Sequence, residues 1–330
     1  MTTARVGDVS ADAGAGRAFG SHSGRQLGTL AGLLTLCVIL WAATPHFLTV
    51  SNLLNVLEQT ALNAVVAVGM TFVIISGGID LSVGSVLALA GICLALALEA
   101  GVPAPAAIGL ALVVGTGCGL INGVLITRGR LPPFIATLGM MSVARGVALM
   151  LAEGRPISGF SEGFRAIATG RILAIPGPVL ITIVIYAVAH FVLTRTVFGR
   201  TTYAIGGNEE AARLSGVQVL FHKTAVYGVA GLTSAAAAVV LTARLNSAQP
   251  TAGTMYELDA IAATVIGGSS LLGGEGTVTG TLIGALIMGV LRNGLNLLNV
   301  SSFLQQVVIG VVIIGAARRQ PVGEPRAWRS

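Results

Sequence analysis

Charge is scarce in this sequence. Only 10% of its 330 residues are charged, and lysine occurs once, as Lys223. A soluble domain carries about a quarter charged residues, so these few charges could not cover a water-exposed surface, and a soluble globular protein is excluded. The net charge of +6 comes from arginines placed singly or in pairs. That scatter argues against a basic face that binds nucleic acid.

Residues that carry catalysis or bind metals are also few. Cys37, Cys93 and Cys118 lie inside apolar runs, at spacings that fit neither a disulfide framework nor a zinc site. The four histidines are far apart. A phosphate-binding loop needs G-x-x-x-x-G-K-[ST], and the single lysine follows His222. We therefore expect no enzyme activity and no cofactor in this chain; if ATP drives the protein, another polypeptide must bind it.

What the sequence has in abundance is small and aliphatic residues. Hydrophobic residues make up 54% of the chain, the mean hydropathy is +0.87, and there are 45 glycines. Small residues let helices approach closely in lipid, and the spacings Gly119-x-x-x-Gly123 and Gly280-x-x-x-Gly284 fit that kind of packing. The composition predicts an all-α integral membrane protein that crosses the bilayer several times.

About 20 apolar residues are needed to cross a bilayer as an α-helix. Successive apolar runs predict about ten transmembrane helices, although two short runs leave nine or eleven possible. The runs cover residues 28–45, 53–76, 83–100, 104–127, 132–152, 174–195, 224–245, 257–272, 276–297 and 303–317.

The distribution of arginine predicts the orientation, because cytoplasmic loops are enriched in arginine and lysine. With both termini in the cytoplasm, most loop arginines face that side. We expect a disordered cytoplasmic tail at 1–27, a membrane domain at 28–317 and a second cytoplasmic tail at 318–330. The two long loops then lie on opposite sides, with 153–173 outside and 196–223 in the cytoplasm.

Within the cytoplasmic loop, the stretch NEEAARLSG predicts a short helix. Asn208 can cap its start, and Glu209 and Glu210 favour its first turn. Arg213 suits the last turn, and Gly216 can end the helix.

Between the second and third runs lies a carboxylate, Asp80, in the stretch ISGGIDLSVGS. In one interpretation Asp80 or Ser82 caps the third helix, while Gly77 and Gly78 allow a tight turn. In the other, the stretch is a broken helix at membrane depth that lines a solute path. The sequence leaves both interpretations open.

A second stretch resembles this one. GGIDLSVG at 77–84 and GGSSLLGG at 267–274 share a Gly-Gly pair, so Gly267 and Gly268 are further candidates for a broken helix. Broken, duplicated segments are frequent near transporter pathways. Glu58 is the acidic residue placed deepest in a run, where it either faces a water-filled path or pairs with Arg145 or Arg244.

Several stretches together resemble the membrane subunit of bacterial sugar ATP-binding-cassette (ABC) importers, the ribose-type permeases. The resemblance covers about residues 45–317. It is carried by SGGIDLSVGS (76–85), FIATLGMM (134–141), YAIGGNEEAARLSGV (203–217), ARLNSAQPTAGTMYELDAIAATVIGGSSLLGGEG (243–276) and GTLIGALIMGVLRNGLNLLNVSSF (280–303).

The resemblance implies a multi-pass protein of the bacterial inner membrane that carries a monosaccharide by alternating access. Two permease chains, identical or paralogous, would dock two ATPase subunits inside and a substrate-binding protein outside. The predicted topology alone places that outer docking surface at 153–173. The resemblance also implies that the short cytoplasmic helix couples the permease to the ATPase. The coupling residues would be Asn208, Glu209, Glu210, Ala211, Ala212 and Arg213.

Other functions remain open at the level of the sequence. The same kind of permease could carry a nucleoside, an amino acid or a signalling furanose. An ion-coupled secondary transporter would use buried carboxylates such as Glu58, and a membrane-embedded enzyme would need paired polar residues that converge inside the bundle.

Overall fold

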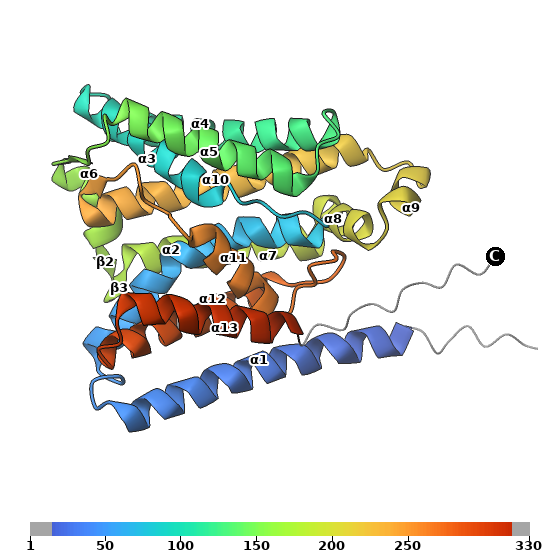
Figure 1. Cartoon of the computed structure of the whole chain (residues 1–330), viewed down its shortest axis with the longest axis horizontal. Coiled ribbons are helices and arrows are strands. Elements are labelled where there is room, and N and C mark those ends of the chain that lie inside the picture. Colours follow the sequence, from blue (N-terminus) through green and yellow to red (C-terminus); the bar gives the residue numbers. More distant parts are fainter. Residues whose placement is uncertain (1–14, 319–330) are drawn as a thin grey trace, which may run out of the picture.

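The computed structural model describes residues 15–318, with side chains from 27 to 315, and the chain is a bundle of helices (Figure 1). The helices are α1 (Ala15–Ala43), α2 (Val50–Ile75), α3 (Val83–Glu99), α4 (Ala104–Thr127), α5 (Pro133–Leu151), α6 (Glu162–Thr169), α7 (Gly177–Arg195), α8 (Val197–Gly207), α9 (Glu209–Leu214), α10 (Val219–Leu245), α11 (Tyr256–Ile266), α12 (Val278–Leu297) and α13 (Ser302–Arg318).

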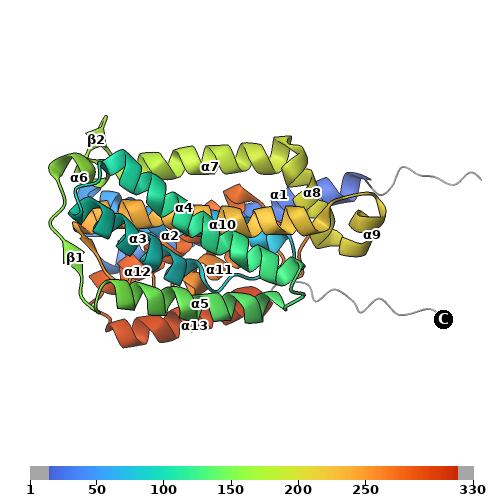
Figure 2. The same cartoon turned by 90° about the horizontal axis from the view of Figure 1, so that it is seen from above.

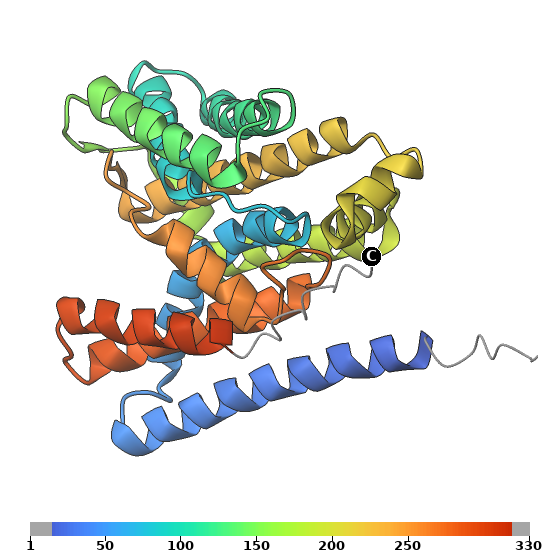
Figure 3. The ribbon, with the colours of Figure 1, turned by 45° about the vertical axis from the view of Figure 1, so that its right-hand side comes forward.

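Helices α2 and α10 form the centre of the bundle. In α2, 83% of the most apolar stretch is buried, compared with 28% in α4, α5 and α7. A helix that is apolar on every side must be covered on every side, by protein or by lipid. In Figure 3 the blue α1 lies along one outer edge and the teal and green α4 and α5 along the opposite edge, so these helices leave much of their apolar surface uncovered by the chain itself.

Within the described residues, six helices are long and apolar enough to cross a membrane: α2, α4, α5, α7, α10 and α12. Three further apolar stretches are shorter, at 27–43, 83–99 and 302–315, and α11 has only 11 residues. A helix lies in each of the ten predicted runs. The number of crossings stays a prediction, because several of these helices are too short to span the bilayer alone.

Two predicted boundaries differ from the structure. The expected tail boundary at residue 27 lies inside a helix, since α1 begins at Ala15, while residues 1–14 and 319–330 lie outside the described part of the chain. The run 257–272 is not one helix, because α11 ends at Ile266. Gly267 caps it and Gly268 has a φ of +93°, a left-handed conformation that glycine adopts without steric cost.

The predicted outer loop is ordered by short strands and a helix. Strand β1 (Ile157–Ser158) pairs antiparallel with β4 (Ser247–Ala248), and β2 (Arg171–Ile172) pairs with β3 (Ile175–Pro176). Figure 2 shows these strands and α6 at one end of the bundle, and α8 and α9 at the other. We call these the α6 end and the α9 end. The described chain begins at the α9 end, and its last helix, α13, runs from the α6 side toward that end (Figure 1).

Both predicted glycine motifs pack helices closely. A Cβ on Gly119 would overlap the carbonyl of Tyr227, and one on Gly123 would meet the Thr224 backbone, so α4 lies directly against α10. In the same way, Gly280 and Gly284 bring α12 against α11. In lipid the hydrophobic effect does not drive helices together, so the van der Waals contact of closely packed backbones stabilises their association. The prediction of tight packing is confirmed.

Replacing Gly119 with leucine should therefore destabilise the protein by about 1–3 kcal/mol, because the side chain must displace backbone atoms of α10. Gly117 on the same helix has open space where a side chain would go, so Gly117→Leu is the matched control and should be neutral. Thermal unfolding in detergent measures the difference. Equal melting temperatures for the two variants would show that the α4–α10 contact does not depend on glycine.

Candidate functional site

The chain reverses direction twice inside the bundle. After α2 reaches the α9 end, residues 76–82 run back, and α3 begins within the bundle and continues to the α6 end (Figure 1). After α10 reaches the α6 end, residues 249–255 run back in the opposite sense, and α11 continues toward the α9 end (Figure 1). We call residues 76–82 and 249–255 the two return segments. The two units run in opposite directions, an arrangement typical of inverted repeats in transporters.

The two short helices start side by side. A Cβ on Gly84, in the first turn of α3, would overlap the carbonyl oxygen of Gly253, just before α11. The carboxylate of Glu257, in the first turn of α11, also lies against Gly84. Two helix N-termini, whose first backbone N–H groups have no partner within their own helix, therefore meet inside the bundle. Irregular backbone at membrane depth is tolerated where it is buried in protein or lines a cavity.

The first return segment is held by a buried polar cluster. Asp80 Oδ1 accepts hydrogen bonds from the Ser82 N–H at 2.8 Å and from the Ser82 hydroxyl at 2.6 Å, and Asn122 of α4 donates to that hydroxyl at 2.9 Å. Asp80 and Ser82 are each 1% exposed. Gly78 lies against the hydroxyl of Tyr227, leaving no room for a side chain, and Gly77 has a φ of +79°.

This geometry corrects one of the two sequence interpretations. Ser82 occupies the cap position of α3, but neither its hydroxyl nor Asp80 accepts a hydrogen bond from the first turn of that helix. Asp80 instead closes a local turn with Ser82, because a short carboxylate reaches the N–H two residues on. The pair therefore shapes the return segment before α3 and does not cap α3 through a side chain.

The second return segment is held by Arg145 of α5. One guanidinium nitrogen donates to the carbonyl oxygens of Pro250 at 2.6 Å and Ala252 at 2.8 Å. Carbonyls outside a helix need such donors when little water reaches them. Arg145 does not pair with Glu58, one of the two partners expected for that residue.

Glu58 pairs with its other expected partner. Its Oε2 lies 3.8 Å from Arg244 Nε, with both side chains partly buried. A second intramembrane pair was missed: Arg292 of α12 donates to both carboxylate oxygens of Asp259 of α11 at 2.7 Å. Two opposite charges within neighbouring apolar runs were the available signal, since such charges rarely stay unpaired in a membrane.

The two similar glycine stretches do not occupy equivalent positions. Gly77 and Gly78 open the first return segment, whereas Gly267 and Gly268 follow α11 and begin the loop to α12. The structural counterpart of 76–82 is 249–255, which has no matching Gly-Gly pair. The glycine stretches resemble each other because both lie where backbones touch: a Cβ on Gly273 would come within 3.0 Å of Gly77.

The predicted helix at the α9 end forms as α9, and its local signals are confirmed. The Asn208 side chain accepts from the Ala211 N–H at 3.0 Å, and Gly216 follows the helix with a φ of +86°. Glu209 lies 3.1 Å from Arg213 and 2.9 Å from Lys223 of α10, so it ties α9 to α10.

The opposite face of α9 is open. The Glu210 side chain is 67% exposed and Leu214 is 81% exposed, while Ala212 packs inward against Ile205 and Val219. Arg213 also reaches Glu210, at 3.5 Å. An exposed leucine beside exposed charges, on a helix that projects from the end of the bundle, is a surface suited to a protein partner.

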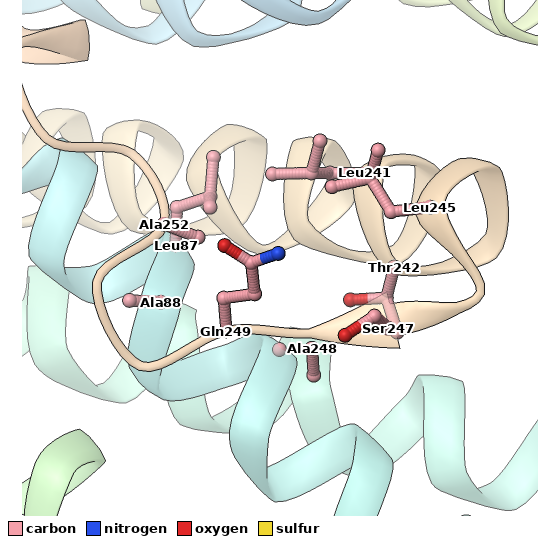
Figure 4. Close-up of a pocket in the computed structure, with 10 residues that line it drawn as sticks. Leu87, Ala88, Leu241, Thr242, Leu245, Ser247, Ala248, Gln249 and Ala252 are labelled. Carbon is pink, nitrogen blue, oxygen red and sulfur yellow. The ribbon is translucent and has the colours of Figure 1, made fainter. Parts of the chain in front are cut away.

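A small cavity lies between α3, α10 and the second return segment, where the Gln249 side chain points toward α10 (Figure 4). Leu87, Thr242 and Ser247 are among its lining residues. Its volume is about 10 Å³, roughly the space of one water molecule. This cavity is too small to hold an organic solute.

Oppositely directed broken helices inside a bundle of apolar helices are a recurring feature of membrane transport proteins. The comparison with protein families agrees: residues 52–317 match the family described as branched-chain amino acid transport system / permease component. The chain belongs to this family of transport permeases and is therefore not an enzyme.

Proteins similar in sequence to this chain include permeases that are named for sugars. The chain is 51% identical to the ribose import permease protein of Bacillus subtilis (strain 168), over 88% of this chain and 91% of that protein. It is 50% identical to the ribose import permease protein of Haemophilus influenzae, over 86% and 89%. It is 39% identical to the D-allose transport system permease protein of Escherichia coli (strain K12), over 88% and 90%. No solved structure matches it.

Proposed function

We propose that this protein is the membrane permease subunit of an ABC importer for ribose or a closely related monosaccharide. The observation that carries the proposal is the identity of about half to named ribose import permeases over most of both chains. The family description names branched-chain amino acids, so an amino acid is the second candidate cargo. The named relatives favour a sugar.

The proposed assembly has two permease chains in the bacterial inner membrane, either identical or paralogous. ATP is bound by separate ATPase subunits, which fits the missing phosphate-binding loop. These subunits dock on α9 in the cytoplasm, and a substrate-binding protein docks at the α6 end, over residues 153–173. Helix α1 begins at the α9 end and α13 runs toward that end. These directions support an even number of spans, with ten as the proposed number and both termini cytoplasmic.

In the proposed mechanism the two permease chains rock against each other when ATP closes the ATPase subunits. Helix α9 receives the movement of the ATPase, and the path then changes between open to the outside and open to the cytoplasm. The proposed path for the sugar lies between the two permease chains. The return segments, with Asp80 and Glu257 near the starts of α3 and α11, are the proposed moving parts.

Uptake of labelled ribose in cells with and without this chain tests the proposal, with xylose, galactose and leucine alongside. An uncoupler is added while glycolysis keeps ATP high. We expect ribose uptake that requires the chain and survives the uncoupler. Loss of uptake with the uncoupler would indicate an ion-coupled secondary transporter, and uptake of leucine alone would replace the sugar with an amino acid.

A further inference from the structure

Helix α8 packs against the bundle through a direct backbone contact at Gly206. A Cβ on Gly206 would overlap the carbonyl oxygen of Ile75 and would also press on the backbone nitrogen of Gly274. Ile75 and Gly274 are themselves joined, since the Gly274 N–H donates to the Ile75 carbonyl at 2.9 Å. The backbone of α8 therefore touches two segments that are about two hundred residues apart in the sequence.

Two further contacts hold α8 in that position. The Tyr203 hydroxyl donates to the Gly276 carbonyl at 2.6 Å, on the same loop as Gly274. On another side of the helix, Thr202 shares a 2.9 Å hydrogen bond with His222 of α10, and the Phe198 ring lies 4.4 Å from the His222 ring. Both Thr202 and His222 are buried, so α8 is fixed to α10 as well as to the loop.

The segments that α8 touches lead directly to the two oppositely directed units. Ile75 is the last residue of α2, and the first return segment begins at the next residue. Gly274 and Gly276 lie in the loop between α11 and α12, so they are connected to the short helix that follows the second return segment. Figure 1 shows α8 at the α9 end, beside the end of α2 and the loop that joins α11 to α12.

We propose that α8 is the positioning element that carries the movement of α9 to both broken-helix units, through the close backbone contact at Gly206. This inference rests on the proposed function. Helix α9 follows α8 with only Asn208 between them, so a displacement of α9 moves α8 directly. Because the backbones touch without intervening side chains, little of that displacement can be absorbed by side-chain rotation.

The neighbouring glycine supplies a matched control. A side chain on Gly207 would meet nothing within 4 Å, whereas one on Gly206 must push α8 away from Ile75. Gly206→Ala and Gly207→Ala thus make the same chemical change, one residue apart on one helix, and only the first changes the contact. Neither substitution touches the exposed face of α9 that is proposed to meet the ATPase.

The experiment measures ribose uptake in cells, and ATP hydrolysis by the permease with its ATPase in liposomes, with and without binding protein and ribose. We expect Gly206→Ala to keep the co-purified ATPase and the basal hydrolysis, while uptake and stimulated hydrolysis fall about tenfold. Gly207→Ala should match the unmodified protein. A purely structural defect would instead lower assembly, basal hydrolysis and uptake together.

Equal uptake by Gly206→Ala and the unmodified protein would overturn the inference, as would an equal loss in both alanine variants. If Gly206→Ala is not recovered from membranes, Tyr203→Phe decides, because it removes the bond to Gly276 at nearly constant volume. We expect it to lower stimulated hydrolysis about threefold, and unchanged stimulation would overturn the inference. Failure of the proposed function appears separately, as an unmodified protein that binds no ATPase subunit.

Discussion

Replacing Asp259 with asparagine is expected to lower the free energy of unfolding by about 3 kcal/mol. Asp259 is 3% exposed on its side chain and receives both hydrogen bonds from Arg292, so the variant leaves the guanidinium beside a neutral amide inside the bundle. The expected loss is at the lower end for a buried pair because the Arg292 side chain is 36% exposed. The pair joins α11 to α12, so the loosened contact lies beside the second broken unit.

The measurement is the melting temperature in detergent, with the amount of inserted protein as a second reading. A double variant, Asp259→Asn with Arg292→Gln, removes both charges and should recover at least half of the lost stability, because no unpaired charge remains. A melting temperature for Asp259→Asn equal to that of the unmodified protein would show that the pair does not stabilise the α11–α12 contact.

Replacing Glu209 and Glu210 with arginine is expected to stop uptake while the protein still inserts. The change reverses the charge of the first turn of α9 and opposes the helix dipole there. It also breaks the contact of Glu209 with Lys223 and places like charges beside Arg213. Both effects displace α9 from the position in which the ATPase is proposed to meet it.

The single variants separate the two effects. Glu210→Arg alters only the exposed face, so it should weaken ATPase binding while leaving α9 attached to α10. Glu209→Arg should loosen that attachment, and Glu209→Gln should do so more mildly. Co-purification of the ATPase and ribose uptake are the readings. Normal uptake by the double arginine variant would contradict the coupling role of α9.

Local features were predictable from the sequence because they depend on neighbours along the chain. Asn208 and Gly216 mark the ends of α9 through hydrogen bonds with residues a few positions away, the first through its side chain and the second through its backbone N–H. The spacing of Gly119 and Gly123 places both on one face of a helix, and that spacing alone predicts a close helix contact. Composition alone similarly determined that the chain belongs in a membrane.

Pairings between distant segments were not predictable in the same way. The sequence allowed Glu58 to pair with Arg145 or Arg244, and only packing selects Arg244. It aligned two Gly-Gly stretches as a repeat, although the structural counterpart of 76–82 is 249–255. A glycine in the sequence indicates that its backbone can approach another segment closely, but it does not indicate which segment.

The sequence by itself determined that this protein lies in a lipid bilayer, where its helices fall along the chain, and which residues begin and end α9. Tertiary structure decided which partners the buried charges take, how the return segments are held, and that α8 lies against the end of α2 and the loop between α11 and α12. The physical reason is range: propensity, capping and hydropathy act within a few residues, whereas ion pairs and backbone contacts between helices depend on how the whole bundle closes.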